Sequence, residues 1–154
     1  MIARMIIPFQ RFFASLGPVR RQQVAALCWR QSEGAVEFLL ITTRRTGRWT
    51  PPKGNVDEGA TPPEAAATEA WEEAGATGDI AAEPIGCYTF LKLTKKGRWA
   101  KYQAAVYPLH VRDMADAYPE LGQRELCWKP QEEAADAVNE PALSALIRAF
   151  QPGR

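Results

Sequence analysis

The stretch from position 61 to 74 constrains the fold of this 154-residue chain most strongly, because it carries every local signal of an α-helix. Thr61 and Glu64 have the spacing of a capping box, and the proline after Thr61 suits the first helical position. Five alanines then favour helix, and Gly75 readily adopts the left-handed conformation found at helix ends. The sequence therefore predicts a helix over 61–74.

Short apolar runs separated by turn-forming residues lie on both sides of this helix and predict β-strands. Residues 24–29 and 36–41 are two such runs, and the turn between them at 32–34 predicts a hairpin. Residues 51–54 are expected to form a loop. Strands around one central helix, followed by terminal helices, predict an α/β fold in which helices cover a mixed β-sheet. Further strands are expected at 86–93, 99–111 and 126–128, and further short helices from Pro130 and from Asn139 to near Phe150.

The length and composition of the chain indicate one globular domain. Its 154 residues suit a single core, with 46% hydrophobic and 24% charged residues. The formal net charge of +1 argues against a general nucleic-acid binder or a membrane-surface protein. We expect an N-terminal arm at 1–20 and a single domain at 21–154. Because the arm is apolar and basic and contains no acid, an organelle-targeting peptide is the alternative.

The cysteines Cys28, Cys87 and Cys127 are widely spaced and lie in apolar runs. An odd number at such spacings indicates neither a disulfide framework nor a zinc site. They therefore predict reduced thiols and a cytoplasmic protein. We expect a monomer or a homodimer with no nucleic-acid or membrane partner.

Three glutamates of the predicted helix, Glu69, Glu72 and Glu73, have the spacing i, i+3 and i+4, which places all three carboxylates on one face. No lysine or arginine occurs between positions 54 and 91, so this charge has no local compensation. Carboxylates on adjacent helical turns suit Mg²⁺ and Mn²⁺, which prefer oxygen ligands. The alternative is a solvated acidic helix face that holds no metal.

Two basic stretches without acids flank this acidic centre. The first has four bases between positions 44 and 53, and the second has five between 92 and 101. A metal-bound polyphosphate needs this combination, because carboxylates hold the metal while Lys and Arg neutralise the remaining phosphate charge. The alternative is that the bases mark exposed strand edges and turns. The candidate substrate-binding residues are Arg44, Arg48, Lys53, Lys92 and Lys101.

The run over positions 54–76, which contains the three glutamates, resembles the Nudix box. In that family pattern a glycine is followed by five residues, a glutamate, seven residues and R-E-U-x-E-E-x-G-U, where U is apolar. The preceding run at 49–54 also looks like the entrance to the box in many members. The positions of this sequence that match the pattern are Gly54, Glu69, Ala70, Glu72, Glu73, Gly75 and Ala76.

Two positions depart from the pattern. Ala60 stands where the family has glutamate, and Thr68 stands where it has arginine. The resemblance implies that these family residues act in support, the arginine bracing the loop–helix–loop and orienting its neighbouring glutamate. Losing both charges together leaves no orphan partner, which is milder than losing one. We therefore interpret the change as a loss of bracing more than a loss of metal ligands, and it predicts reduced activity.

The resemblance implies a Nudix-like α/β/α sandwich with a mixed sheet and Mg²⁺ or Mn²⁺ as cofactor. The three helix glutamates would be the metal ligands, helped by a backbone carbonyl near Lys53 or Gly54. The family usually adds a glutamate from outside the box, either as a further ligand or as the base for water. We expect Glu120 to be that residue, with Glu125 as the second choice. The implied catalytic residues are Glu69, Glu72, Glu73 and Glu120.

The function implied by the resemblance is metal-dependent hydrolysis of a phosphoanhydride bond in a small-molecule substrate. The entrance run and the lysines after the box look most like the branch that cleaves diadenosine polyphosphates or diphosphoinositol polyphosphates. ADP-ribose and nucleoside triphosphates stay open as substrates. A non-catalytic nucleotide- or phosphate-binding protein of the same fold is the alternative, and the two departures motivate it. A purely structural domain would leave the clustered carboxylates unexplained.

Overall fold

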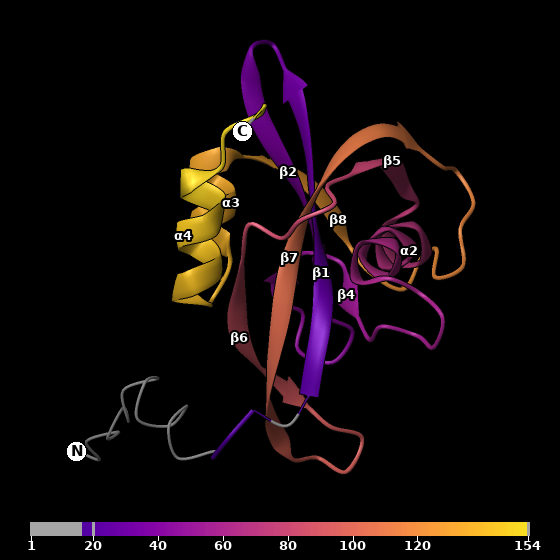
Figure 1. Cartoon of the computed structure of the whole chain (residues 1–154), viewed down its shortest axis with the longest axis vertical. Helices are drawn as coiled ribbons and strands as arrows, with labels where there is room; N and C mark the ends of the chain where they lie inside the picture. Colours follow the sequence, from indigo (N-terminus) through magenta and orange to yellow (C-terminus); the bar gives the residue numbers. More distant parts are fainter. Residues whose placement is uncertain (1–16, 20, 154) are drawn as a thin grey trace, which may run out of the picture.

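The computed structural model describes residues 17–19 and 21–153 and shows one sheet with helices on both faces (Figure 1). The predicted arm at 1–20 falls almost entirely outside the described residues. No helix of the described part is long and apolar enough to cross a membrane. The strands are β1 (Arg21–Ser32), β2 (Ala35–Thr42), β3 (Trp49–Thr50), β4 (Lys53–Gly54), β5 (Ala76–Ile80), β6 (Gly86–Leu93), β7 (Trp99–Met114) and β8 (Leu126–Pro130), and the helices are α2 (Pro62–Ala74), α3 (Gln131–Ala137) and α4 (Pro141–Ala149).

The sheet is mixed, as the sequence predicted. Strand β1 lies parallel to β7 and antiparallel to β2 and β4, and β2 in turn pairs with β3 and β8. The long strand β7 pairs antiparallel with β6 near its start and with β5 near its end. The predicted hairpin between β1 and β2 is confirmed, since Ser32 pairs with Ala35 across the turn.

The continuous apolar run of β1 reflects burial on both faces of the sheet. Ala25 and Leu27 pack in a core with residues of α3 and α4. Ala26 and Cys28 face the other way and pack in a second core with the alanines of α2. Figure 1 shows α3 and α4 on one side of the sheet and α2 on the other, which confirms the predicted three-layer arrangement. The small alanine side chains allow α2 to lie close to the sheet.

Helix α2 has the termini that its sequence predicts. The Thr61 side chain accepts a hydrogen bond from the Glu64 backbone amide, and the Glu64 side chain accepts one from the Thr61 amide, which completes the capping box. Gly75 ends the helix in the left-handed conformation with φ of 68°. These caps fix both the start and the end of the acidic helix.

One local prediction was wrong in part, and strands β3 and β5 were not predicted. Residues 53–54 are not simply loop, because they pair with Val24 and Ala25 of β1 as the short strand β4. Strand β5 was not predicted, because residues 76–80 lack the alternation of apolar and polar side chains that marks a half-buried strand. Its position depends on β7, whose long edge offers backbone partners to it. Both strands extend the sheet beside α2 and help to hold that helix.

Candidate active site

A cavity of about 410 Å³ lies where α2, β4, the start of β3 and the loop between β7 and β8 meet. Glu69, Glu72 and Glu73 of α2 all line it. The helical spacing of the three carboxylates therefore leads them into one concave site, rather than onto an open surface. Lys53 and Gly54 of β4 lie beside them.

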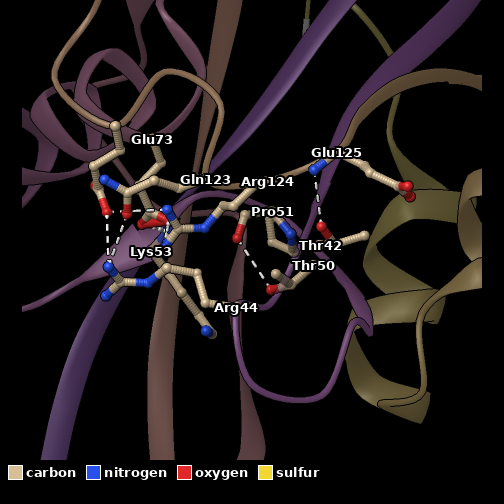
Figure 2. A network of polar contacts seen from close by, with 10 residues as sticks. Thr42, Arg44, Thr50, Pro51, Lys53, Glu73, Gln123, Arg124 and Glu125 are labelled. Carbon is tan, nitrogen blue, oxygen red and sulfur yellow. Dashed lines mark hydrogen bonds and ion pairs between the residues drawn. The ribbon is translucent and has the colours of Figure 1, made fainter.

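Glu73 is the most buried of the three glutamates, with 5% of its surface exposed. Its Oε1 accepts a hydrogen bond from the Lys53 backbone amide at 3.2 Å, and its Oε2 lies 3.2 Å from Nη2 of Arg124. Burial raises the pKa of Glu73, while Arg124 and Lys53 oppose the rise by favouring the charged form. Figure 2 shows Glu73 beside Arg124, with Lys53 close by.

Glu69 occupies a cradle that only glycine permits. A Cβ atom at Gly54 would lie 2.3 Å from the Glu69 carboxyl group, so the side chain rests directly against the backbone of β4. Burial raises the pKa of Glu69 to about 8, and a hydrogen bond and repulsion from Glu73 add to the rise. Two neighbouring carboxyl groups in this environment do not both ionise readily without a cation.

The structure separates the two candidates for the glutamate outside the box. Glu120 lines the cavity, and its Oε1 lies 3.0 Å from Nη1 of Arg124 and 3.5 Å from Nη1 of Arg44. Glu125 is exposed and does not line the cavity; its backbone amide donates to Oγ1 of Thr42. Figure 2 shows Glu125 and Thr42 apart from the group around Glu73. The geometry therefore favours Glu120 over Glu125.

Four of the five candidate substrate-binding bases line the same cavity, namely Arg44, Arg48, Lys53 and Lys92. Lys101 does not line it. On β7, Lys101 pairs with Leu91 of β6, whereas Lys92 of β6 pairs with Ala100. The first basic stretch is thus brought to the acidic helix as a whole, whereas the second contributes only Lys92 to the cavity.

The cavity bases differ in what they contact. The Arg48 guanidinium donates to the Leu91 carbonyl at 2.8 Å, which ties it to β6. The Lys53 ammonium lies 4.6 Å from the ring centre of Phe90, and burial lowers the pKa of Lys53 to about 8. Burial also lowers the pKa of Lys92. Lys53 is a poorly solvated cation, which an anionic ligand would stabilise, whereas Lys92 is more exposed to solvent.

Arg124 and Glu140 line the cavity as well, and sequence reasoning gave neither a role. Arg124 lies four residues after Glu120 in a loop, where that spacing carries no structural signal. Glu140 precedes α4, and its Oε2 is buried without a hydrogen-bond partner. Burial raises the pKa of Glu140. Neither residue belongs to a local pattern, so only the fold reveals them.

The donor chemistry of the site fits a hard divalent cation. The five cavity glutamates offer carboxylate oxygens, and burial together with the neighbouring carboxylates raises the pKa of Glu69, so a cation would stabilise its charged form. Among the described residues, however, no three acidic, histidine or cysteine side chains converge closely enough to hold a metal ion as they stand. The guanidinium of Arg124 lies between two of the carboxylates. A metal therefore fits the donor set, and its ligands would have to reorient around it.

The family profile of the NUDIX domain matches residues 19–150, a range that includes helix α2 and all residues that line the cavity. The chain belongs to the Nudix family. Membership confirms the predicted α/β fold and the predicted enzyme class, a Nudix-type pyrophosphohydrolase. The substrate, the metal and the individual site residues stay predictions.

Similar proteins agree with this assignment. The chain is 29% identical over 140 residues to "Nudix hydrolase 18, mitochondrial" of Arabidopsis thaliana, covering 84% of this chain and 77% of that protein. It is 28% identical to the bis(5'-nucleosyl)-tetraphosphatase (asymmetrical) of Caenorhabditis elegans, covering 79% and 88%. The crystal structure of the C. elegans Ap4A hydrolase superposes with a TM-score of 0.58 at 25% identity, covering 82% and 92%. The plant relative is named mitochondrial, so the cytoplasmic location of this chain stays a prediction.

The two departures from the Nudix box have simple local surroundings. Thr68 is exposed, and its Oγ1 donates to the Glu64 carbonyl one turn earlier at 3.0 Å. Ala60 is half-buried in the loop before α2. Neither side chain reaches the cavity, and neither replaces the charges that the family pattern has at these positions.

Proposed function

We propose that this Nudix enzyme hydrolyses a phosphoanhydride bond of a dinucleoside polyphosphate, with Mg²⁺ or Mn²⁺ as cofactor. One observation carries the proposal: the three glutamates of α2 and four of the predicted bases, from distant strands and loops, line one cavity. A metal-bound polyphosphate needs both kinds of charge at the same place. The volume of about 410 Å³ suits part of such a substrate, which would extend beyond the cavity.

Glu69, Glu72 and Glu73 would hold the metal, with a backbone carbonyl of β4 beside them. When bound, the ion supplies a Lewis acid that polarises the phosphate and makes water a better nucleophile. Glu120 lies in the same cavity on the loop before β8, and we assign it the role of further ligand or proton acceptor. Its half-buried position gives it access to both the carboxylates and the cavity.

The bases would bind the phosphate chain and stabilise the charge of the leaving phosphate. Lys53 is well placed, because its backbone amide binds Glu73 while its ammonium extends along the Phe90 ring. With a pKa of about 8, the Lys53 ammonium is mostly charged at pH 7, and a bound phosphate would raise that pKa. Arg44 and Lys92 add two cations from other elements. Arg48 contributes its charge while holding β6.

The choice of a dinucleoside polyphosphate is supported by the relatives. The C. elegans tetraphosphatase and Ap4A hydrolase both match more than three quarters of this chain. The number of bases in the cavity agrees with a substrate that carries several phosphates. Diphosphoinositol polyphosphates would contact the same basic residues and are the second substrate class to be assayed. ADP-ribose and nucleoside triphosphates follow.

A substrate panel with Mg²⁺ or Mn²⁺ tests the function directly. We expect the highest kcat/KM with diadenosine tetraphosphate. The Glu72→Gln/Glu73→Gln double variant should lose at least 100-fold in rate, because two carboxylates of the proposed metal site are gone. The matched control is Glu58→Gln in the exposed loop before α2, which does not line the cavity. Wild-type rates in the double variant would refute the metal-site assignment.

A second candidate function is nucleotide or phosphate binding without turnover, which Ala60 and Thr68 favour. Calorimetry would then show binding of diadenosine tetraphosphate, while no metal gives product. Hydrolysis that disappears in Glu72→Gln would eliminate this candidate. The Ala60→Glu/Thr68→Arg variant separates the two further, because a large gain in rate would show that bracing was the missing part.

A further inference from the structure

Arg124 is a buried cation inside the acidic end of the cavity. Its side chain is 10% exposed, and its two terminal nitrogens contact different carboxylates. Nη2 lies 3.2 Å from Oε2 of Glu73, and Nη1 lies 3.0 Å from Oε1 of Glu120. The planar guanidinium can span two acids in this way because its donors point in fixed directions. It thus links α2 to the loop between β7 and β8.

That loop is fastened to the end of α2 by its backbone as well. The Ala115 amide donates to the Gly75 carbonyl at 2.8 Å, and the Glu120 amide donates to the Glu72 carbonyl at 3.0 Å. The Tyr118 ring covers Gly75 so closely that a Cβ there would lie 2.4 Å from it. The backbones that carry Glu73 and Glu120 are therefore fixed relative to each other, and Arg124 fixes their side chains.

Helix α2 contains no lysine or arginine that could hold its own carboxylates in position. Position 68, where the family pattern has arginine, holds an exposed threonine that bonds back to Glu64. No lysine or arginine occurs anywhere between positions 54 and 91. The nearest compensating charge for Glu73 comes from Arg124, more than fifty residues later in the sequence. The brace is supplied from outside the helix.

We propose that Arg124 is the positioning residue of this site, which holds the Glu73 and Glu120 carboxylates toward the cavity in place of the arginine absent at position 68. The inference rests on the proposed function, because these carboxylates are the proposed metal site. Each carboxylate oxygen has two lone pairs, so the contacts of Arg124 leave acceptor capacity for a metal. Without the guanidinium, the buried Glu73 and the half-buried Glu120 would repel each other and turn apart.

The test is a Mn²⁺ titration of the metal-free protein without substrate, followed by electron paramagnetic resonance of free Mn²⁺. We expect Arg124→Gln to weaken Mn²⁺ binding at least tenfold, as removal of outer-sphere partners does in metal sites. Arg124→Lys should show most of the same loss, because one ammonium lacks the fork that spans both acids. The matched control is Arg112→Gln, which removes an exposed arginine paired with Asp79 at 2.8 Å. Unchanged Mn²⁺ binding by Arg124→Gln would overturn the proposal, because Arg124 would then have no effect on the site. Tighter binding would also overturn it, because Arg124 would then compete with the metal.

A rescue experiment separates positioning from general folding. Adding Ala60→Glu and Thr68→Arg to Arg124→Gln should restore most of the lost Mn²⁺ affinity, since the helix then carries its own brace. Failure of this rescue in a folded triple variant would count against the assigned role. Arg124→Lys keeps the charge and bulk, so it serves as the test variant if Arg124→Gln does not fold.

A readout without metal distinguishes failure of this inference from failure of the proposed function. If the wild-type protein binds no Mn²⁺, the proposed function fails, and urea midpoints still test the brace. The midpoint shifts of Arg124→Gln and Glu120→Gln should then be strongly non-additive in the double variant, because both remove the same contact. Additive shifts would show that Arg124 does not position Glu120.

Discussion

The two walls of the cavity differ in how the chain places their charges. One wall is α2, where three glutamates follow from helical spacing within five consecutive residues. The other wall contains the loop between β7 and β8, where Glu120 and Arg124 are placed by contacts with distant elements. Both walls contribute acids, yet only the second contributes a buried cation.

This difference explains how the site tolerates its own charge. The helix places its carboxylates together and carries no base of its own, so burial and the neighbouring carboxylates raise the pKa of Glu69, and burial raises the pKa of Glu73. The loop then brings Arg124 against the most buried of them. A site divided in this way can take its brace from the loop instead of the helix, since Thr68 bonds only to its own helix while Arg124 contacts Glu73.

The largest expected effect comes from removing the carboxylate of Glu120, the acid of the loop wall. We expect Glu120→Gln to lower kcat by about 100-fold or more, the range typical of a lost proton acceptor or metal ligand. Glu125→Gln should change kcat less than twofold, because that side chain is exposed and outside the cavity. Steady-state rates with diadenosine tetraphosphate at saturating Mg²⁺ measure both. Equal effects of the two variants would show that the loop wall has no chemical role.

The sequence predicted the helix wall almost completely, because helix signals and carboxylate spacing are local. The capping box, the left-handed Gly75 and the shared face of the three glutamates were all confirmed. It predicted the strands around the helix well, except for β3, β4 and β5, whose formation depends on the neighbours they pair with. Local pattern thus determines the part of the site that one element carries.

The loop wall could be predicted only in part. Glu120 was chosen over Glu125 by position relative to the last strand, and no local pattern separated the two. Arg124 gave no signal, because its partners lie in a helix far away in sequence and in a turn of irregular backbone. Lys101 looked equivalent to Lys92, although only Lys92 lines the cavity. Which face of a strand is buried depends on the whole sheet.

A smaller effect tests the basic residues of the hairpin. We expect Lys92→Met to raise KM at least about tenfold, since a charge-assisted hydrogen bond to phosphate contributes about 1.5 kcal/mol or more. Lys101→Met should leave KM within about twofold, because Lys101 does not line the cavity. Initial rates over a range of diadenosine tetraphosphate concentrations give both constants. If Lys101→Met raised KM as much as Lys92→Met, the substrate would extend across the hairpin rather than along the cavity.

The smallest effect concerns the uncompensated charge of the helix wall. Glu69 has a pKa of about 8 in the folded protein and an ordinary carboxyl pKa when unfolded, so between about pH 5 and 8 the folded state holds the extra proton. Stability of the metal-free protein should therefore fall as pH rises through this window, at a slope of no more than about 1.4 kcal/mol per pH unit for one proton. Because the side chain is partly exposed, solvent screening should limit the total to about 2 kcal/mol.

Urea unfolding at a series of pH values measures this dependence, and Glu69→Gln is the matched variant because an amide does not titrate. We expect the variant to lose the share of the slope that Glu69 contributes between about pH 5 and 8, while the raised pKa values of Glu73 and Glu140 maintain the rest. Saturating Mg²⁺ should reduce the slope in the wild-type protein, because a cation at the helix wall favours the charged carboxylate. A wild-type profile as flat as that of Glu69→Gln would mean that Arg124 already neutralises the whole helix wall. The two walls would then be electrostatically balanced before any metal binds.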